Sequence, residues 1–198
     1  MNDVTNDQIV SPAIDLRSGI ASDVSAIHAL ITANLSIGHL LPRTLDDIES
    51  HVHRFVVAVL DGAVIGCGEL APLSGEVAEV RSLVVDAAHR GQRTGVALVN
   101  ALADRARELG YVTLCAFTHQ PAHFIRLGFS IVPHVWVPEK IAHDCVSCDL
   151  FRHCGQYAVS LSLRAGSGLR LEPAAPPARA VAAPRASVER LRLIQIPA

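Results

Sequence analysis

The chain has 198 residues, a formal net charge of −2 and a hydrophobic fraction of 50%. This length suits one domain with tails, and the apolar content is sufficient for a sizeable core. The near-neutral charge gives no support for general nucleic-acid binding. The apolar runs are short and interrupted, so no membrane span is predicted. The N-terminus shows neither the basic start nor the apolar stretch of a signal peptide.

Five cysteines are an odd number in a chain with no visible export signal. Such usage is typical of reduced thiols or metal ligands and not of a disulfide framework. The sequence therefore predicts a cytoplasmic protein with no membrane or nucleic-acid partner, and it leaves a homodimer open.

Hydrophobic periodicity predicts the first half of the fold. Residues 1–12 are polar and are predicted to be flexible. In chain order, we expect a strand at 13–19, helices at 24–31 and 44–51, and a three-stranded meander at 55–60, 64–70 and 79–85.

Short-range signals set the ends of these elements. Ser22 and Asp23 are good cap residues for the first helix, and Thr44 can cap the second. Asp61-Gly62 is a strong two-residue hairpin signal between the first two meander strands.

The second half alternates helices and strands. We expect a helix at 92–109 ended by Gly110, a strand at 112–117, a helix at 121–127, a strand restarting at 128, and a last strand at 157–163. Because a long crossover helix joins the strands at 79–85 and 112–117, these two are predicted to be parallel. The fold class is α+β with a domain at 13–163, and the Pro/Ala/Arg-rich tail at 164–198 is predicted to be largely disordered.

The stretch EVRSLVVDAAHRGQRTGVAL, residues 79–98, joins a strand to a helix through a glycine-bearing turn. The first N–H groups of a helix have no intrahelical partner and carry partial positive charge, so such a turn binds anions. Arg81, Arg90 and Arg93 strengthen that expectation. Neither a nucleoside-triphosphate P-loop nor a dinucleotide GxGxxG is present. The plain alternative is an ordinary helix start after a flexible turn.

Gln92-x-x-Gly95-x-Ala97, preceded by Arg90-Gly91, resembles the pyrophosphate-binding Q/R-x-x-G-x-G/A motif of the GNAT acetyltransferases. The order of predicted elements is similar to the GNAT fold, a mixed, mostly antiparallel sheet flanked by helices. That resemblance implies a splayed parallel strand pair and acetyl-CoA as co-substrate. The pyrophosphate would then lie against a contiguous set of residues: Arg90, Gln92, Arg93, Thr94, Gly95, Val96 and Ala97.

Three further stretches resemble the short, stand-alone bacterial N-acetylglutamate synthases. They are LLPR at 40–43, THQPAHFIRLGF at 118–129, and PEKIAHDCVSC at 138–148 followed by Cys154. The implied reaction moves an acetyl group from acetyl-CoA to the α-amino group of L-glutamate, the first step of arginine biosynthesis. The alternatives are a GNAT enzyme for another small amine or a protein N-terminus, and a non-catalytic acyl-CoA-binding sensor.

Acetyl transfer needs a base, because the α-amine is protonated at neutral pH. Glu79 stands at the family's base position, with Glu76 as the alternative and a solvated surface charge as the plain reading of Glu79. Backbone N–H groups of Leu83, Val84 and Val85 are implied to bind the acetyl carbonyl and pantetheine.

Arginine grips carboxylates with two parallel hydrogen bonds. Arg43 stands at the family's carboxylate-binding position. Arg81 shares a strand face with Glu79 and either binds substrate or pairs with Glu79. Lys140 and Arg152 are weaker candidates.

No general acid is assigned for the leaving thiolate. The family's hydroxyl position reads Phe117-Thr118-His119 here. Thr118 or His123 can serve, or no acid is needed, because a thiol with a pKa of ~8.5 leaves without help.

The spacing Cys145-x2-Cys148-x5-Cys154, with His143 alongside, offers four ligands of the kind that zinc prefers. We favour idle cytosolic thiols over a structural zinc site, because three cysteines do not close a site by themselves, and no metal is assigned. Cys67 and Cys115 are predicted to be strand core residues.

Overall fold

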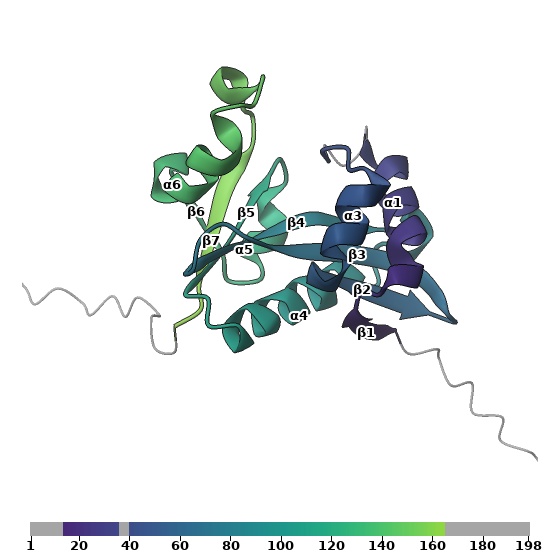
Figure 1. Ribbon diagram of the computed structural model, residues 1–198. Helices are drawn as coiled ribbons and strands as arrows, with labels where there is room; N and C mark the ends of the chain where they lie inside the picture. Colours follow the sequence, from purple (N-terminus) through teal and green to yellow (C-terminus); the bar gives the residue numbers. More distant parts are fainter. Residues whose placement is uncertain (1–13, 36–39, 165–198) are drawn as a thin grey trace, which may run out of the picture. The chain divides into compact units, whose positions relative to one another are not determined.

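Residues 14–35 and 40–164 are described by a computed structural model (Figure 1). The predicted flexible segment 1–12 lies outside these ranges, as does all but the first residue of the predicted tail 164–198. Within them, no helix is both long and apolar enough to cross a membrane.

Seven strands form one sheet in the order β1-β2-β3-β4-β5-β7-β6. Their bounds are β1 Asp15–Ser18, β2 Phe55–Leu60, β3 Ala63–Pro72, β4 Val77–Val85, β5 Thr113–Thr118, β6 Ser130–Val132 and β7 Tyr157–Ser162. All neighbouring pairs are antiparallel except β4 and β5, which are parallel. The predicted α+β class and its single parallel pair are therefore confirmed.

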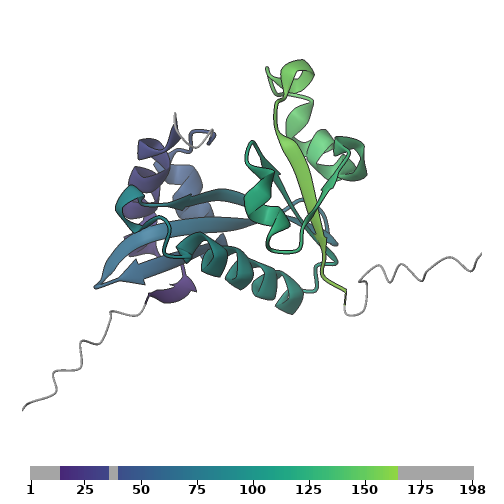
Figure 2. The same ribbon diagram turned by 180° about the vertical axis from the view of Figure 1, so that it is seen from behind.

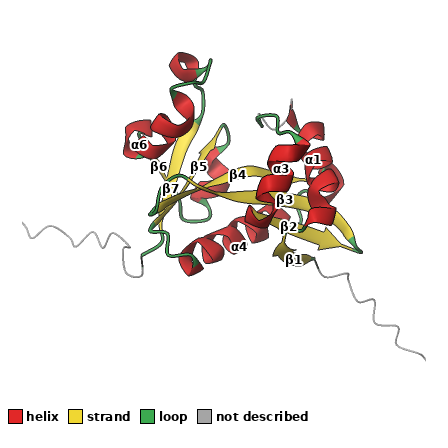
Figure 3. Ribbon diagram, viewed as in Figure 1, coloured by secondary structure: helices red, strands yellow, loops and turns green. Residues whose placement is uncertain are grey.

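The helices cover both faces of the sheet (Figures 1 and 3). They are α1 Val24–Ala33, α3 Leu45–His51, α4 Thr94–Glu108, α5 Pro121–Ile125 and α6 Pro138–Lys140. The long helix α4 packs on one face, where Leu98, Leu102 and Ala106 join a buried apolar cluster with strand residues. On the other face α1 and α3 form a second cluster around Ile27 and Ile48. Figure 2 shows α4 from behind, crossing the sheet.

Local signals set most of the element ends. The Thr44 side chain accepts a hydrogen bond from the Asp47 N–H at 3.2 Å, as expected of an N-cap. Asp61 and Gly62 have positive φ angles of 49° and 80°, which is the conformation of a type I′ hairpin turn. Gly110, with φ of 82°, ends α4.

Two helix starts differ from prediction. Helix α4 begins at Thr94 and not at Gln92, because Arg93 adopts a left-handed conformation with φ of 64° that no α-helix contains. Asp23 occupies the N-cap position of α1 as predicted, but its side chain makes no capping hydrogen bond to that helix. Instead, the Asp23 carboxylate accepts hydrogen bonds from the Ile20 N–H and from Arg17, at 2.9 Å and 2.6 Å.

The predicted helix 121–127 is also shorter than expected. Its α-helical part, α5, ends at Ile125. The chain turns at Gly128, whose φ of 89° suits glycine alone, and β6 begins at Ser130 and not at Gly128.

Strands β4 and β5 pair along only part of their length. Their ladder has three pairs, the last of which joins Glu79 to Cys115, although β4 continues to Val85. A β-bulge lies in the unpaired half, where Ser82 and Leu83 together stand opposite Gly68 of β3 and Ser82 has φ of 50°. The two strands therefore diverge beyond Glu79, and the edge of β4 from 80 to 85 has no ladder partner on that side within the described residues.

We predict that Leu102→Ala lowers the free energy of unfolding by about 2–5 kcal/mol, because it removes buried methyl groups and leaves a cavity between α4 and the sheet. Leu102 is 0% exposed. Leu109→Ala, at the end of the same helix where the side chain is 61% exposed, should change it by no more than about 0.5 kcal/mol. Urea denaturation measures both, and similar losses would contradict this packing.

Candidate active site

A cavity of about 760 Å³ opens where β4 and β5 diverge. Its walls come from the second half of β4, the end of β5, the connector before α3, helix α5 and the segment from Lys140 to Cys148. The sequence places these segments far apart, and the sheet brings them together. The predicted site residues that line the cavity are Arg43, Glu79, Arg81, Leu83, Val84, Val85 and Arg90, together with the weaker candidates Thr118, His123, Lys140 and Cys148. The predicted pyrophosphate residues 92–97 do not line it.

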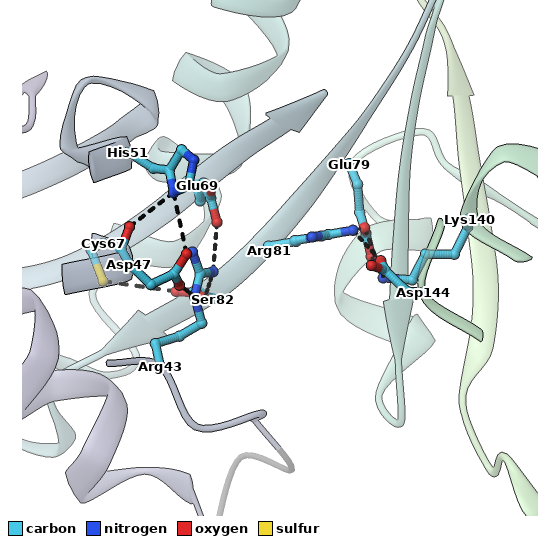
Figure 4. Close-up of polar contacts among 10 residues, drawn as sticks. All are labelled: Arg43, Asp47, His51, Cys67, Glu69, Glu79, Arg81, Ser82, Lys140 and Asp144. Carbon is cyan, nitrogen blue, oxygen red and sulfur yellow. Dashed lines mark hydrogen bonds and ion pairs between the residues drawn. The ribbon is translucent and has the colours of Figure 1, made fainter. Parts of the chain in front are cut away.

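The first charged group in the wall is centred on Arg43 (Figure 4). Its Nη1 donates to Glu69 Oε2 at 2.7 Å and to Ser82 Oγ at 3.3 Å, and its Nε donates to Asp47. Glu69 is only 2% exposed. Burial would raise the pKa of Asp47, but the Arg43 guanidinium outweighs burial and leaves that pKa below its ordinary value.

The second charged group consists of Glu79, Arg81, Lys140 and Asp144, and Figure 4 shows it on the other side of the drawn set. Arg81 Nε donates to Glu79 Oε2 at 2.5 Å, and Lys140 Nζ lies 2.8 Å from Glu79 Oε1. The Asp144 carboxylate accepts from both Arg81 and Lys140. Lys140 also lies over the Phe117 ring, 5.3 Å from its centroid.

These contacts decide between several sequence-based alternatives. Glu79 is 3% exposed, so the plain reading of a solvated surface charge is wrong. Glu76 is exposed and does not line the cavity. Arg81 pairs with Glu79, which is one of the two alternatives that the sequence left open for it.

Sequence reasoning missed Glu69 and Asp144. A glutamate in the middle of a buried, mostly apolar strand was a usable signal for Glu69, since a buried carboxylate needs a cation. Nothing local to Asp144 indicates its contact with Arg81, because the two residues are 63 positions apart in the chain.

The predicted anion-binding turn lies at the far end of β4. Gly91 and Arg93 have φ angles of 80° and 64°, and Arg93 leads directly into the helical Thr94. Left-handed residues of this kind, at the start of a 15-residue helix, are typical of turns whose backbone N–H groups bind anions. Arg90 is held beside it by hydrogen bonds from Nη2 to Asn34 Oδ1 and from Nε to the Val85 carbonyl, the latter at 3.1 Å.

Two buried polar atoms at this turn have no hydrogen-bond partner among the described residues: Thr94 Oγ1 and His123 Nε2. His123 lies against Gly95, since a Cβ built on Gly95 would stand 3.7 Å from His123 Nε2. Burial lowers the pKa of His123 and Arg126 lowers it further, while the backbone of Gly95 acts in the opposite direction. An uncharged imidazole, which lines the cavity, and a buried hydroxyl therefore lie together at the start of α4.

The cysteines divide into core and surface thiols, and all five are free. Cys67 and Cys115 are buried as predicted, and burial raises the pKa of Cys67 to about 12. In the described part of the chain, no group of three or more His, Cys, Asp or Glu side chains is arranged to hold a metal ion. His143, one of the predicted zinc candidates, instead contacts the Asp144 carboxylate at 2.8 Å.

The chain matches the model of the acetyltransferase (GNAT) family over residues 26–129. It is also 30% identical over 154 residues to an uncharacterised N-acetyltransferase of Chlorobaculum tepidum, an alignment that covers 77% of this chain and 99% of that protein. The chain therefore belongs to the GNAT family of acetyltransferases, and the predicted fold and enzyme class are confirmed.

Other relatives are named for amino-acid acetylation. The amino-acid acetyltransferase of Shewanella oneidensis is 33% identical over 136 residues, which cover 67% of this chain and 31% of that enzyme. The chain thus spans about a third of the length of that curated relative.

Solved structures agree on the fold. N-acetylglutamate synthase from Neisseria gonorrhoeae, complexed with coenzyme A and N-acetyl-glutamate, superposes with a TM-score of 0.69 at 24% identity, over 78% of this chain and 36% of that one. A Mycobacterium tuberculosis protein in complex with CoA gives a TM-score of 0.64 at 27% identity, over 75% of this chain and 98% of that one.

Proposed function

We propose that this protein transfers the acetyl group of acetyl-CoA to the α-amino group of L-glutamate, as an N-acetylglutamate synthase of arginine biosynthesis. The observation that carries the proposal is the buried Glu79 carboxylate, which lines the cavity where β4 and β5 part. The names of the Shewanella and Neisseria relatives support the choice of an amino acid as acceptor.

The residues at the diverging strands fit acetyl-CoA. The turn from Gly91 to Gly95 offers backbone N–H groups to a pyrophosphate, with Thr94 and His123 as additional polar partners. From Val80 to Val85, β4 offers an edge about 17 Å long that is not paired with β5, which suits an extended pantetheine arm. Acetyl-CoA, as the bound co-substrate, supplies the activated acetyl group.

In the proposed reaction, the Glu79 carboxylate takes a proton from the acceptor's α-ammonium group, directly or through water. Its carboxylate stays in position because Arg81 and Lys140 hold it. Backbone N–H groups of residues 83–85 then stabilise the negative charge that develops on the thioester carbonyl oxygen.

Arg43 is the residue we assign to an acceptor carboxylate. It lines the cavity, and its Nη2 donates to no described residue, while Nε and Nη1 are fixed by Asp47 and Glu69. A guanidinium held in this way is pre-oriented, so it loses little freedom on binding a carboxylate.

We further propose a cytoplasmic location. All five cysteines are free, including the pair Cys145 and Cys148 that stand close in sequence. Free thiols in such number are typical of a reducing compartment.

The first test is thiol release from acetyl-CoA by the purified protein, with L-glutamate, L-glutamine, L-aspartate and simple amines as acceptors. We expect the highest kcat/KM with L-glutamate. Arg43→Lys should raise the KM for L-glutamate about tenfold, because lysine keeps the charge facing Glu69 but has no counterpart of the free Nη2 group. Arg107→Ala, a surface control, should leave KM unchanged.

The outcomes separate the competing functions. Preference for another amine with no effect of Arg43→Lys would contradict the glutamate assignment while keeping the acetyltransferase. Acetyl-CoA that binds but is turned over with no acceptor would instead favour a sensor.

The assignment of the turn near α4 to acetyl-CoA is tested by His123→Ala. We expect it to weaken acetyl-CoA binding about five- to tenfold, because the ligand then loses a buried hydrogen-bond partner. His123→Gln, which keeps a polar group, should recover part of the loss. Calorimetric titration measures both, and His53→Ala, at an exposed histidine, is the control. An unchanged dissociation constant for His123→Ala would rule out this contact.

A further inference from the structure

Three cations line the part of the cavity that we assign to the acceptor: Arg43, Arg81 and Lys140. Each of them already pairs with acidic side chains of the protein. Arg43 is held by Glu69 and Asp47. Arg81 and Lys140 both contact Glu79 and Asp144. An incoming carboxylate therefore finds Arg81 and Lys140 already neutralised, and binding there requires competition with a carboxylate of the protein itself.

The two acids on Arg81 and Lys140 differ in how easily they can be displaced. Glu79 is 3% exposed and lies on the central strand β4, between β3 and β5. The Asp144 side chain is 32% exposed and lies on the helical turn Ile141–Cys145, between β6 and β7. Because Asp144 belongs to no strand, its carboxylate can leave without disturbing the sheet.

The contacts of the Asp144 carboxylate are those expected of a bound substrate carboxylate. Its Oδ2 accepts from Arg81 Nη2 and from Lys140 Nζ, the latter at 2.8 Å, and the side chain lines the cavity. Both of its cationic partners also contact Glu79. Arg81 and Lys140 therefore each bridge the Asp144 carboxylate and the proposed base.

Asp144 is charged at neutral pH. Burial would raise its pKa, but the hydrogen bonds and charges of Lys140, His143 and Arg81 outweigh burial and leave the pKa below its ordinary value. Its negative charge is thus present under the conditions in which the acceptor binds.

We infer that Asp144 occupies the subsite of the acceptor's side-chain carboxylate and is displaced from Arg81 and Lys140 when L-glutamate binds. Asp144 is then a specificity-determining residue, since it penalises an anionic side chain more than an uncharged one. This inference rests on the proposed function, because it requires an amino acid as acceptor.

The test compares Asp144→Asn with the wild-type protein, using L-glutamate and L-glutamine as acceptors. We expect the KM for L-glutamate to fall about fivefold, the effect of removing one partly exposed competing charge, whereas the KM for L-glutamine changes less than about twofold. The kcat for L-glutamate should stay within about twofold of the wild-type value. Asp149→Asn, an exposed residue of the same segment, is the matched control, and Asp144→Ala should act in the same direction as Asp144→Asn.

A purely structural role for Asp144 predicts the opposite result. If Asp144 serves to orient Lys140 and Arg81, Asp144→Asn raises the KM for both acceptors or lowers kcat, and the inference is overturned.

A second measurement remains decisive if the proposed function itself fails. Glutarate has both carboxylates of glutamate but no amine, so its binding can be followed without turnover by calorimetry in the presence of CoA. Tighter binding of glutarate by Asp144→Asn than by wild type supports the displacement. Equal or weaker binding contradicts it, whatever the acetyl acceptor.

Discussion

Glu79 is the last residue of β4 that pairs with β5, and its carboxylate is buried between Arg81 and Lys140. A buried carboxylate is costly unless cations and hydrogen bonds compensate for its lost hydration. One cation comes from β4 itself and the other from α6, just before the turn that carries Asp144. Arg81 and Lys140 therefore hold the proposed base, and Lys140 also connects the segment after β6 to the sheet where the parallel ladder ends.

The divergence of the strands gives this charged group its chemical setting. If β4 and β5 were paired along their whole length, the backbone N–H groups on that edge of β4 would bond to β5. Instead the ladder ends at Glu79 and β4 has a bulge at Ser82, so the edge of β4 that faces β5 is open to the cavity. Beyond the other end of β4, the left-handed Arg93 lies beside Thr94 and His123, whose buried polar atoms have no hydrogen-bond partner in the described part of the chain. One strand thus links the proposed base to the predicted anion site.

Features with local causes could be predicted from the sequence. The strand at 55–60, the Thr44 cap and the hairpin at Asp61-Gly62 depend on residues within a few positions of one another, and each is confirmed. The parallel pair followed from the length of the crossover helix between its strands. The start of α4 was missed because a left-handed arginine is rare and has no local sequence signal.

The charged pairs of the site were harder to foresee. Arg43 meets Glu69 across 26 residues, and Arg81 meets Asp144 across 63. Such contacts follow from sheet register and from the path of the chain after β6, which periodicity does not give. Asp23 shows the same limit on a smaller scale, since its pairing with Arg17 prevailed over the predicted cap.

The proposed acetyl transfer depends most on Glu79 acting as a base in this cavity. The most direct measurement is single-turnover acetyl transfer to the best acceptor by Glu79→Gln, with Glu76→Gln, at the exposed glutamate three residues earlier, as the matched control. We expect Glu79→Gln to slow transfer about a hundredfold with little change in acetyl-CoA affinity, and Glu76→Gln to match the wild type. A Glu79→Gln protein that is folded, binds acetyl-CoA and transfers the acetyl group at the wild-type rate would contradict the account.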